Sequence, residues 1–295
     1  MTITTEKRKM LWGGGAALLA MFFTVILGET LFFDIFQSFE HKTLDWRFSY
    51  RIRLEGEQPP IEDIVIVDID ERSLEKYGQF PWDRSYHADL VNYLNADGVL
   101  GIAFDIQFFD SPSDSEGQKK FIQALDECGR VINAVALYPE DKDHFRYAMK
   151  ENPFGANIPP SENLESLDFT GFDRIEGPPK ALADASAKLG FVNFFPDPDG
   201  VTRRTPLALK FSDDMAFPLS LTSLNVVFDN GSNPITYEDG YLYPAMGYSV
   251  PVDEEGDFII NFVGPPRSFR YISYYDVREK RLPPDYFNGK FVFVG

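Results

Sequence analysis

Two carboxylates stand two residues apart at the end of an apolar stretch. Asp68 and Asp70 close the segment 63–70, whose run of Ile and Val predicts a strand buried between helices. Side chains two apart on a strand share a face, and the carboxyl ends of parallel strands form the edge where open α/β sheets bind ligands. The pair is therefore a candidate for acid chemistry or ligand binding at that edge.

The pattern IVIVDID is similar to the Asp-x-Asp motif of haloacid-dehalogenase-type phosphatases, which use one aspartate as nucleophile, the other as acid, and bind magnesium. That family has Gly-Thr or Gly-Val directly after the second aspartate, whereas Glu71, Arg72 and Ser73 follow here. A membrane-tethered, magnesium-dependent phosphatase using Asp68 and Asp70 is therefore kept as an alternative. The structural interpretation is that one or both aspartates cap the next helix.

Other polar and aromatic residues extend this candidate site. Asp105 ends the second predicted strand and lies near Asp70 if the two strands are neighbours, while Trp82 and Arg84 follow a short first helix. Asn193 lies within a later strand, where a buried amide must find partners. We expect Asp70, Trp82, Arg84, Asp105 and Asn193 to form a ligand-binding pocket with an aromatic wall. The structural alternatives are a core tryptophan, an ion-paired arginine and a satisfied amide.

No catalytic residue, cofactor or metal is predicted. The sequence has no nucleophile elbow, phosphate loop, His-Glu metal motif or glycine-rich dinucleotide fingerprint. His41, His87 and His144 have no ligand spacing, and the single cysteine, Cys128, rules out an internal disulfide and is expected to be a buried apolar residue. A formal net charge of −18 would repel a polyanion, so nucleic acid is not an expected partner.

An uncharged segment near the N-terminus predicts a membrane anchor. Residues 10–28 carry no charge and follow Lys7, Arg8 and Lys9. A helix of this length covers roughly 28 Å, close to the hydrocarbon thickness of a bilayer. Basic residues stay on the cytoplasmic side, so residues 1–9 are expected inside and the bulk of the chain outside the cell inner (plasma) membrane, on its periplasmic face. The alternative, a cleaved signal peptide, lacks a small-residue cleavage site.

A helical stalk is expected to follow the anchor over residues 29–55. Leu31, Phe32, Ile35, Phe36 and Phe39 recur at intervals of three and four residues, and the segment 56–60 ends the pattern. We expect a homodimer formed through the stalk and membrane helices. The alternative is that the stalk packs its apolar stripe on its own domain.

Residues 61–295 are predicted to form an α/β domain with a mixed, largely parallel sheet and helices on both faces. Helices are predicted at 84–94, 118–128, 179–188, 218–228 and 274–279, and strands at 63–70, 98–109, 130–137, 190–195, 201–211, 258–263 and 290–294. The turn PDPDG at 196–200 predicts a hairpin between its two flanking strands, and a second hairpin is expected around 237–243. The segment 138–177 is predicted to be an irregular insertion.

Several segments, in this order, resemble the second type of CHASE domain, the cyclase and histidine-kinase associated sensory extracellular domain. They are LDWRFSYRIR (44–53), DIVIVDIDERSL (63–74), FPWDR (80–84), GIAFDIQF (101–108), GFVNFFPDPDGVTRR (190–204), IINFVGP (259–265) and GKFVFVG (289–295). The resemblance implies a receptor whose outer domain controls a cytoplasmic output through further membrane helices. Family members usually continue past the last matching strand, so we expect the chain to be the front part of a longer protein.

The expected function is that of an extracytoplasmic sensory domain that binds a small, unidentified signal. By family association the expected output is an adenylate or guanylate cyclase, with a histidine or serine/threonine kinase as the alternative. A structural envelope protein that binds a protein partner through its acidic surface is a further alternative. The requirement common to any receptor is a ligand with different affinity for two arrangements of the domain.

Overall fold

A computed structural model describes residues 17, 19, 21–25, 33–55, 60–108, 115–138, 161–164, 167, 171–172, 174–211, 214–229, 233–245 and 247–295. The chain divides into two compact units. Unit 1 comprises residues 1–59 and 262–265, and unit 2 comprises residues 60–261 and 266–295.

Within the described residues, no helix has both the length and the apolar character needed to cross a bilayer. Most of the predicted anchor, 10–28, lies outside the described residues. Its described positions, 17, 19 and 21–25, are helical and exposed. The membrane span therefore stays a prediction from the sequence.

Unit 1 contains the predicted stalk helix as α2 (Phe33–Glu55). Its contact within the unit is with the segment 262–265, which comes from far along the chain. The Phe48 ring meets the Phe262 ring edge-on, with centroids 6.0 Å apart. Arg51 donates a hydrogen bond to the Phe262 carbonyl and places its guanidinium over the Phe48 ring. One face of α2 is therefore held to a second segment of the same unit.

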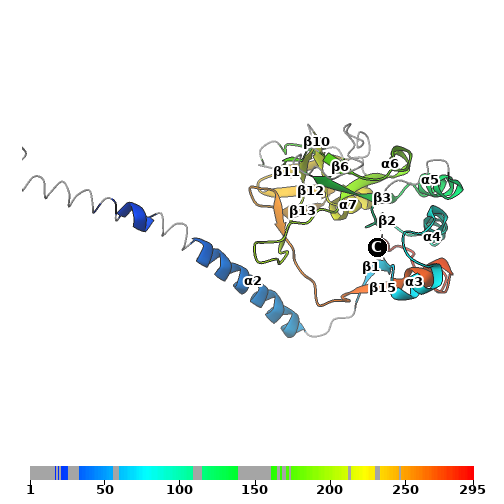
Figure 1. Ribbon diagram of the computed structural model, residues 1–295, viewed down its shortest axis with the longest axis horizontal. Coiled ribbons are helices and arrows are strands. Elements are labelled where there is room, and N and C mark those ends of the chain that lie inside the picture. Colours follow the sequence, from blue (N-terminus) through cyan, green and yellow to red (C-terminus); the bar gives the residue numbers. More distant parts are fainter. Residues whose placement is uncertain are drawn as a thin grey trace, which may run out of the picture. The chain divides into compact units, whose positions relative to one another are not determined.

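Unit 2 is built on a seven-stranded sheet, and its largely parallel character is confirmed (Figure 1). Its order is β15 (Phe269–Ser273), β1 (Ile61–Asp68), β16 (Phe291–Val294), β2 (Gly101–Phe104), β3 (Val131–Tyr138) and β6 (Arg174–Glu176), with β7 (Lys188–Phe191) also paired to β3. All of these pairs are parallel except β3 with β6, which is antiparallel.

Helices cover both faces of this sheet, as predicted. Val65 and Val67 of β1 and Phe104 of β2 are fully buried on the face covered by α4 (Arg84–Ala96), α5 (Glu116–Cys128), α6 (Lys180–Ala185) and α8 (Tyr274–Arg278). Ala103 and Ile132 point the other way, toward α7 (Leu219–Asp229). Burial on both faces explains why these strands are continuously apolar rather than alternating.

Capping residues fix where the helices begin. Asp70 accepts a hydrogen bond from the Ser73 amide at the start of α3 (Glu71–Tyr77), and Asp83 accepts one from the Ser85 amide at the start of α4. Ser115 caps α5 in the same way. Each side-chain oxygen satisfies an amide that has no partner within its helix, so the sequence determines these boundaries locally.

The strand 269–273 was not predicted, and it changes the topology. β15 is the edge strand next to β1, and β16 lies between β1 and β2. The strands that precede Asp70 and Asp105, β1 and β2, are therefore not neighbours. β15 is short and carries exposed Arg270 and Tyr271, so it lacks the apolar run that revealed the inner strands.

The predicted hairpin between 190–195 and 201–211 is wrong. β7 pairs with β3, whereas β8 (Arg204–Pro206) pairs with β14 (Asp257–Ile259). β9 (Leu209–Phe211) pairs with β10 (Asp214–Ala216) and β5 (Gly171–Phe172). The PDPDG turn itself forms, since the Gly200 amide donates to the Asp197 carbonyl at 2.8 Å. Its flanking segments diverge because their partners lie elsewhere in the unit.

The second predicted hairpin is confirmed. β11 (Ile235–Glu238) and β12 (Tyr241–Ala245) pair antiparallel across Asp239 and Gly240, whose φ angles of 48° and 84° suit a two-residue hairpin turn. β13 (Tyr248–Pro251) and β4 (Ser161–Glu162) complete this sheet. Residues 139–160 of the predicted irregular insertion lie outside the described residues. Its described part holds the short strands β4, β5 and β6, so it is not irregular throughout.

A buried arginine ties the PDPDG turn together. Arg203 is 4% exposed and contacts Asp197 at 2.8 Å and both carboxylate oxygens of Asp199 at 2.8 and 2.9 Å. Its neighbour Arg204 forms an exposed ion pair with Asp253. Removing one partner of a buried ion pair leaves an uncompensated charge, whereas an exposed pair contributes little to stability.

We expect Arg203→Ala to lower the free energy of unfolding by about 3 kcal/mol, because Asp197 and Asp199 lose their counter-ion. The matched change Arg204→Ala should cost less than about 1 kcal/mol. Urea denaturation followed by circular dichroism measures both. Equal losses in the two variants would contradict the assignment of Arg203 as the residue that holds the turn.

Candidate functional site

Asp70 stands at the carboxyl end of β1 as the cap of α3. Its Oδ1 accepts hydrogen bonds from the Ser73 amide at 2.9 Å, the Ser73 hydroxyl at 2.6 Å and the Ser273 hydroxyl at 2.9 Å. Burial works against the charged carboxylate, but these hydrogen bonds outweigh it and lower the pKa of Asp70. Its structural interpretation as a cap is confirmed.

Asp68 lies beside Asp70 and in register with Ser273 of β15. Burial and the neighbouring Asp70 charge raise the pKa of Asp68, while Arg267 opposes this shift. Within the described residues, no group of three or more His, Cys, Asp or Glu side chains is placed to hold a metal ion. The phosphatase alternative therefore gains no support from the geometry, because Asp70 is engaged as a cap.

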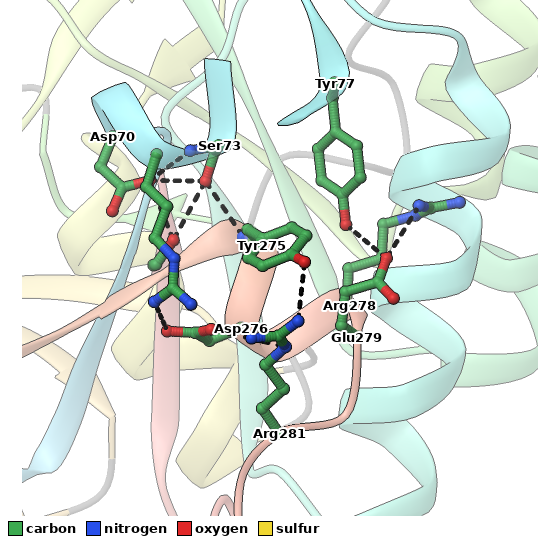
Figure 2. A network of polar contacts seen from close by, with 10 residues as sticks. Asp70, Ser73, Tyr77, Tyr275, Asp276, Arg278, Glu279 and Arg281 are labelled. Atoms are coloured by element: carbon green, nitrogen blue, oxygen red, sulfur yellow. Dashed lines mark hydrogen bonds and ion pairs between the residues drawn. The ribbon is translucent and has the colours of Figure 1, made fainter. Parts of the chain in front are cut away.

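A polar network extends from Asp70 across α3, β15 and α8 (Figure 2). The Ser73 hydroxyl accepts a hydrogen bond from the Tyr275 amide at 3.0 Å, which joins α3 to the start of α8. Arg72 of α3 contacts Asp276 of α8 at 2.6 Å, and Tyr77 donates to Glu279 at 2.8 Å. Three side chains of α3, those of Arg72, Ser73 and Tyr77, are thus bonded to the α8 segment.

Two arginines lie against the Tyr275 ring within this network. Arg72 and Arg281 place their guanidinium carbons 5.1 and 4.5 Å from the ring centroid. Arg281 also donates to the Tyr275 hydroxyl at 2.7 Å, and both arginines contact Asp276 (Figure 2). The arginines, the ring and the carboxylate hold one another in place, so this surface cluster is a joint between helices.

Arg278 carries the connection from α8 to α4. It donates to Asp89 of α4 at 2.9 Å and lies over the Tyr86 ring at 3.9 Å and the Tyr77 ring at 5.0 Å. One side chain therefore holds α8 to both α3 and α4, through cation–π contacts and a charge-assisted hydrogen bond.

Beneath this polar layer, Tyr274 and His87 form a buried contact. Both are 0% exposed, and the Tyr274 hydroxyl lies 3.0 Å from His87 Nδ1. The rings of Phe104, Phe108 and Phe121 surround His87 at 5.2–5.8 Å between centroids. Burial, helped by the nearby positive charge of Arg84, lowers the pKa of His87 to about 3. His87 is therefore neutral in the folded protein at physiological pH.

Trp82 and Arg84, two predicted ligand-binding residues, belong to this buried layer. Trp82 packs on Tyr274 with centroids 5.0 Å apart and donates from Nε1 to the Gly78 carbonyl at 2.8 Å. Arg84 is 8% exposed and stacks over the Phe108 ring at 4.4 Å. Burial lowers the pKa of Arg84, and the Asp83 charge partly offsets this. The interpretation of Trp82 as a core residue is confirmed.

The remaining predicted residues lie apart from this layer. Asp105 is exposed at the carboxyl end of β2, where its amide donates to the Val294 carbonyl at 2.9 Å, and β16 separates it from Asp70. Partial burial raises the pKa of its carboxyl group. Asn193 bonds the Leu137 amide and carbonyl at 2.8 and 2.7 Å, so it is the satisfied structural amide of the alternative interpretation.

The structure thus brings Trp82 and Arg84 into one layer and places Asp70 at its rim, but it does not join all five predicted residues in one pocket. Their role in ligand binding stays a prediction. A hollow of about 360 Å³ lies elsewhere, on the β11–β12 sheet, and is lined by residues that include Thr236, Glu238 and Tyr243. Cys128 is buried as expected, and burial raises the pKa of its thiol.

The residues of the joint were missed because their types suggest no reaction. Ser73, His87, Tyr274, Tyr275 and Arg278 contact residues that are about 190–200 positions away in the chain. One signal was available, since the segment YISYYDVR gathers tyrosines and charged residues around a very short helix. Such a composition indicates a helix that packs through rings and ion pairs.

The described residues thus define an α/β domain whose candidate site is a joint between helices. The chain matches the family model of the CHASE2 domain over residues 16–295 and belongs to that family. CHASE2 domains are extracellular sensory parts of membrane signalling receptors, so the resemblance drawn from the sequence motifs is confirmed. No curated protein and no solved structure matched the chain.

Acidification should destabilise the domain through His87. The folded protein keeps His87 neutral down to about pH 3, whereas the unfolded chain protonates it near 6.5, so the unfolded state binds the extra proton between these values. We expect the free energy of unfolding to fall by up to about 1.4 kcal/mol per pH unit as the pH drops through this window.

Urea denaturation at several pH values checks this. His87→Gln should flatten the pH dependence, while Tyr274→Phe should lower stability by about 1 kcal/mol and keep the slope, because it removes only the hydrogen bond. An unchanged slope in His87→Gln would show that other groups control the acid sensitivity.

Proposed function

We propose that this chain is the signal-input region of a transmembrane receptor, anchored by residues 10–28 with its bulk outside the cytoplasm, and that it controls a cytoplasmic nucleotide cyclase. Family membership supports the sensory role and the extracellular location. The anchor is supported by the uncharged run behind Lys7, Arg8 and Lys9. The cyclase rests on family association.

The observation that carries the proposal is the pairing of the two strands that follow unit 1 in the chain. β1 begins shortly after α2 ends, and β15 begins shortly after the segment 262–265. The two strands lie side by side in parallel, with the Ile61 amide donating to the Ser268 carbonyl at 2.9 Å. Two of the three chain connections between the units, at 59/60 and 265/266, therefore enter the sheet as one bonded pair.

The joint is attached directly to this pair. β15 runs into α8 without a loop, and α3 follows β1 after Asp70. A signal that changes how α8 packs on α3 and α4 would therefore also shift β15 and β1. Through these two strands it would act on the chain segment that leads to the stalk. This supplies the coupling element that a receptor requires, namely a packed unit whose arrangement a ligand can bias.

The signal is proposed to be a small molecule that binds near the rim of this joint, where Asp70 and Arg72 are accessible. Such a ligand shifts the receptor only if it binds two arrangements of α8 with different affinity. A charged group of the ligand can compete for the contacts within the network of Arg72, Tyr275, Asp276 and Arg281, because it can replace one of them.

The proposal is tested by the membrane topology of the chain, measured with reporter fusions. We expect alkaline phosphatase fused after Phe48 to be active, because this enzyme requires an oxidising compartment, and green fluorescent protein fused there to be dark. Fusions after Lys9 serve as the matched control and should behave oppositely. A fluorescent fusion at Phe48 with inactive phosphatase would place the domain in the cytoplasm and overturn the proposal.

A further inference from the structure

The stalk helix α2 has two different faces. At about 100° per residue, Phe48, Arg51 and Ile52 lie on one side of the helix, and this side contacts Phe262. Phe39, Trp46, Tyr50 and Leu54 cluster on the opposite side. The spacing of these four residues, seven, four and four positions, makes a continuous stripe along the helix; we call it the stalk stripe.

The stalk stripe is apolar and open. Phe39, Trp46 and Leu54 are 66%, 65% and 70% exposed, and Tyr50 is 49% exposed. Trp46 and Tyr50 stack with ring centroids 5.4 Å apart, so the stripe presents an ordered surface and not isolated side chains. Contiguous exposed patches of large apolar residues mark interaction sites.

We propose that the stalk stripe pairs with the same stripe of a second copy of this chain, the two helices running parallel. This rests on the proposed anchor, which holds both stalks in the same direction and at the same height above the membrane. A two-fold axis then places each residue opposite its own copy, with Phe39 on Phe39 and Trp46 on Trp46. Aromatic pairs of this kind stabilise contacts beyond the area that they bury.

The exposed area suits this occupant. Large apolar side chains carry about 150–250 Å² each, so the exposed part of the stripe is on the order of 500 Å² per helix. Two copies together bury about 1,000 Å², the size at which specific protein interfaces begin. Lipid is a poorer occupant, because the exposed charged residues Glu40, Lys42 and Arg47 lie at the edges of the stripe.

The chain offers a clean cross-linking test, since its single cysteine is buried and can be replaced by Cys128→Ala. Single cysteines are then introduced into the full chain in lipid nanodiscs. Phe39→Cys and Trp46→Cys probe the stripe, while His41→Cys and Phe48→Cys, each two residues further on, probe the opposite face. Oxidation with copper phenanthroline is followed on non-reducing gels.

We expect most of the protein to form disulfide-linked dimers when the cysteine is at position 39 or 46, and little of it to do so when the cysteine is at 41 or 48. The reason is that a disulfide requires β-carbons roughly 4 Å apart. Equal cross-linking at all four positions would indicate random collision and overturn the proposal. No cross-linking at 39 and 46 would also overturn it, and would assign the stripe to lipid or to another part of the chain.

A second measurement guards against variants that misfold. In detergent, analytical ultracentrifugation of the wild-type chain should show a dimer. The double change Trp46→Ala/Tyr50→Ala should raise the dissociation constant of this dimer at least about tenfold. The control His41→Ala should leave the dimer intact. A monomeric wild type, or a dimer unaffected by the double change, contradicts the pairing even if the topology fusions behave as expected.

Discussion

The contact between Tyr274 and His87 is the constraint on which the organisation of unit 2 depends. Two polar side chains are buried here without exposure to water, and the Tyr274 hydroxyl and His87 Nδ1 satisfy each other among aromatic rings, whereas His87 Nε2 has no hydrogen-bond partner among the described residues. Burying an unpaired hydroxyl or imidazole would cost several times the net value of one hydrogen bond, so α8 cannot leave α4 without a penalty on both. The short helix α8 is thereby held in one place despite having little surface of its own.

This position of α8 explains why a small element can have a large effect. Its polar side is bonded to α3 through Arg72 and Asp276, and its buried side is bonded to α4. It continues β15, which pairs with β1 along the edge of the sheet. Movement of α8 therefore changes the contacts of an edge strand, which has only one neighbour, more readily than those of the inner strands.

Much of this architecture is readable from the sequence, and the failures have identifiable physical causes. The strands β1, β3 and β16 and the helices α4, α5 and α7 follow from apolar periodicity and from caps such as Asp83 and Ser115. The strand β15 is not predicted from the sequence, because an edge strand with exposed side chains has no apolar run. The PDPDG hairpin failed because turn chemistry fixes the turn, whereas the pairing of the flanking strands is decided by partners far along the chain.

The candidate site was less predictable than the fold. The sequence predicted a site built on carboxylates at the sheet edge. In the structure, Asp70 is a helix cap and Asp105 lies two strands away. The sequence placed Trp82 and Arg84 correctly after the first helix, but their burial depends on rings from β2, α5 and α8. The joint between α3, α4 and α8 depends on long-range pairs, and no local motif encodes such pairs.

In the proposed receptor, α8 couples the sensory domain to its output. It is tested by the cyclic-nucleotide production of cells in which this domain stands in front of the proposed cyclase, comparing Tyr274→Phe with Tyr241→Phe, an exposed tyrosine on β12. We expect the first change to shift the basal output and the second to leave it unchanged. Equal output from both variants and the wild type, at equal protein levels, would contradict it.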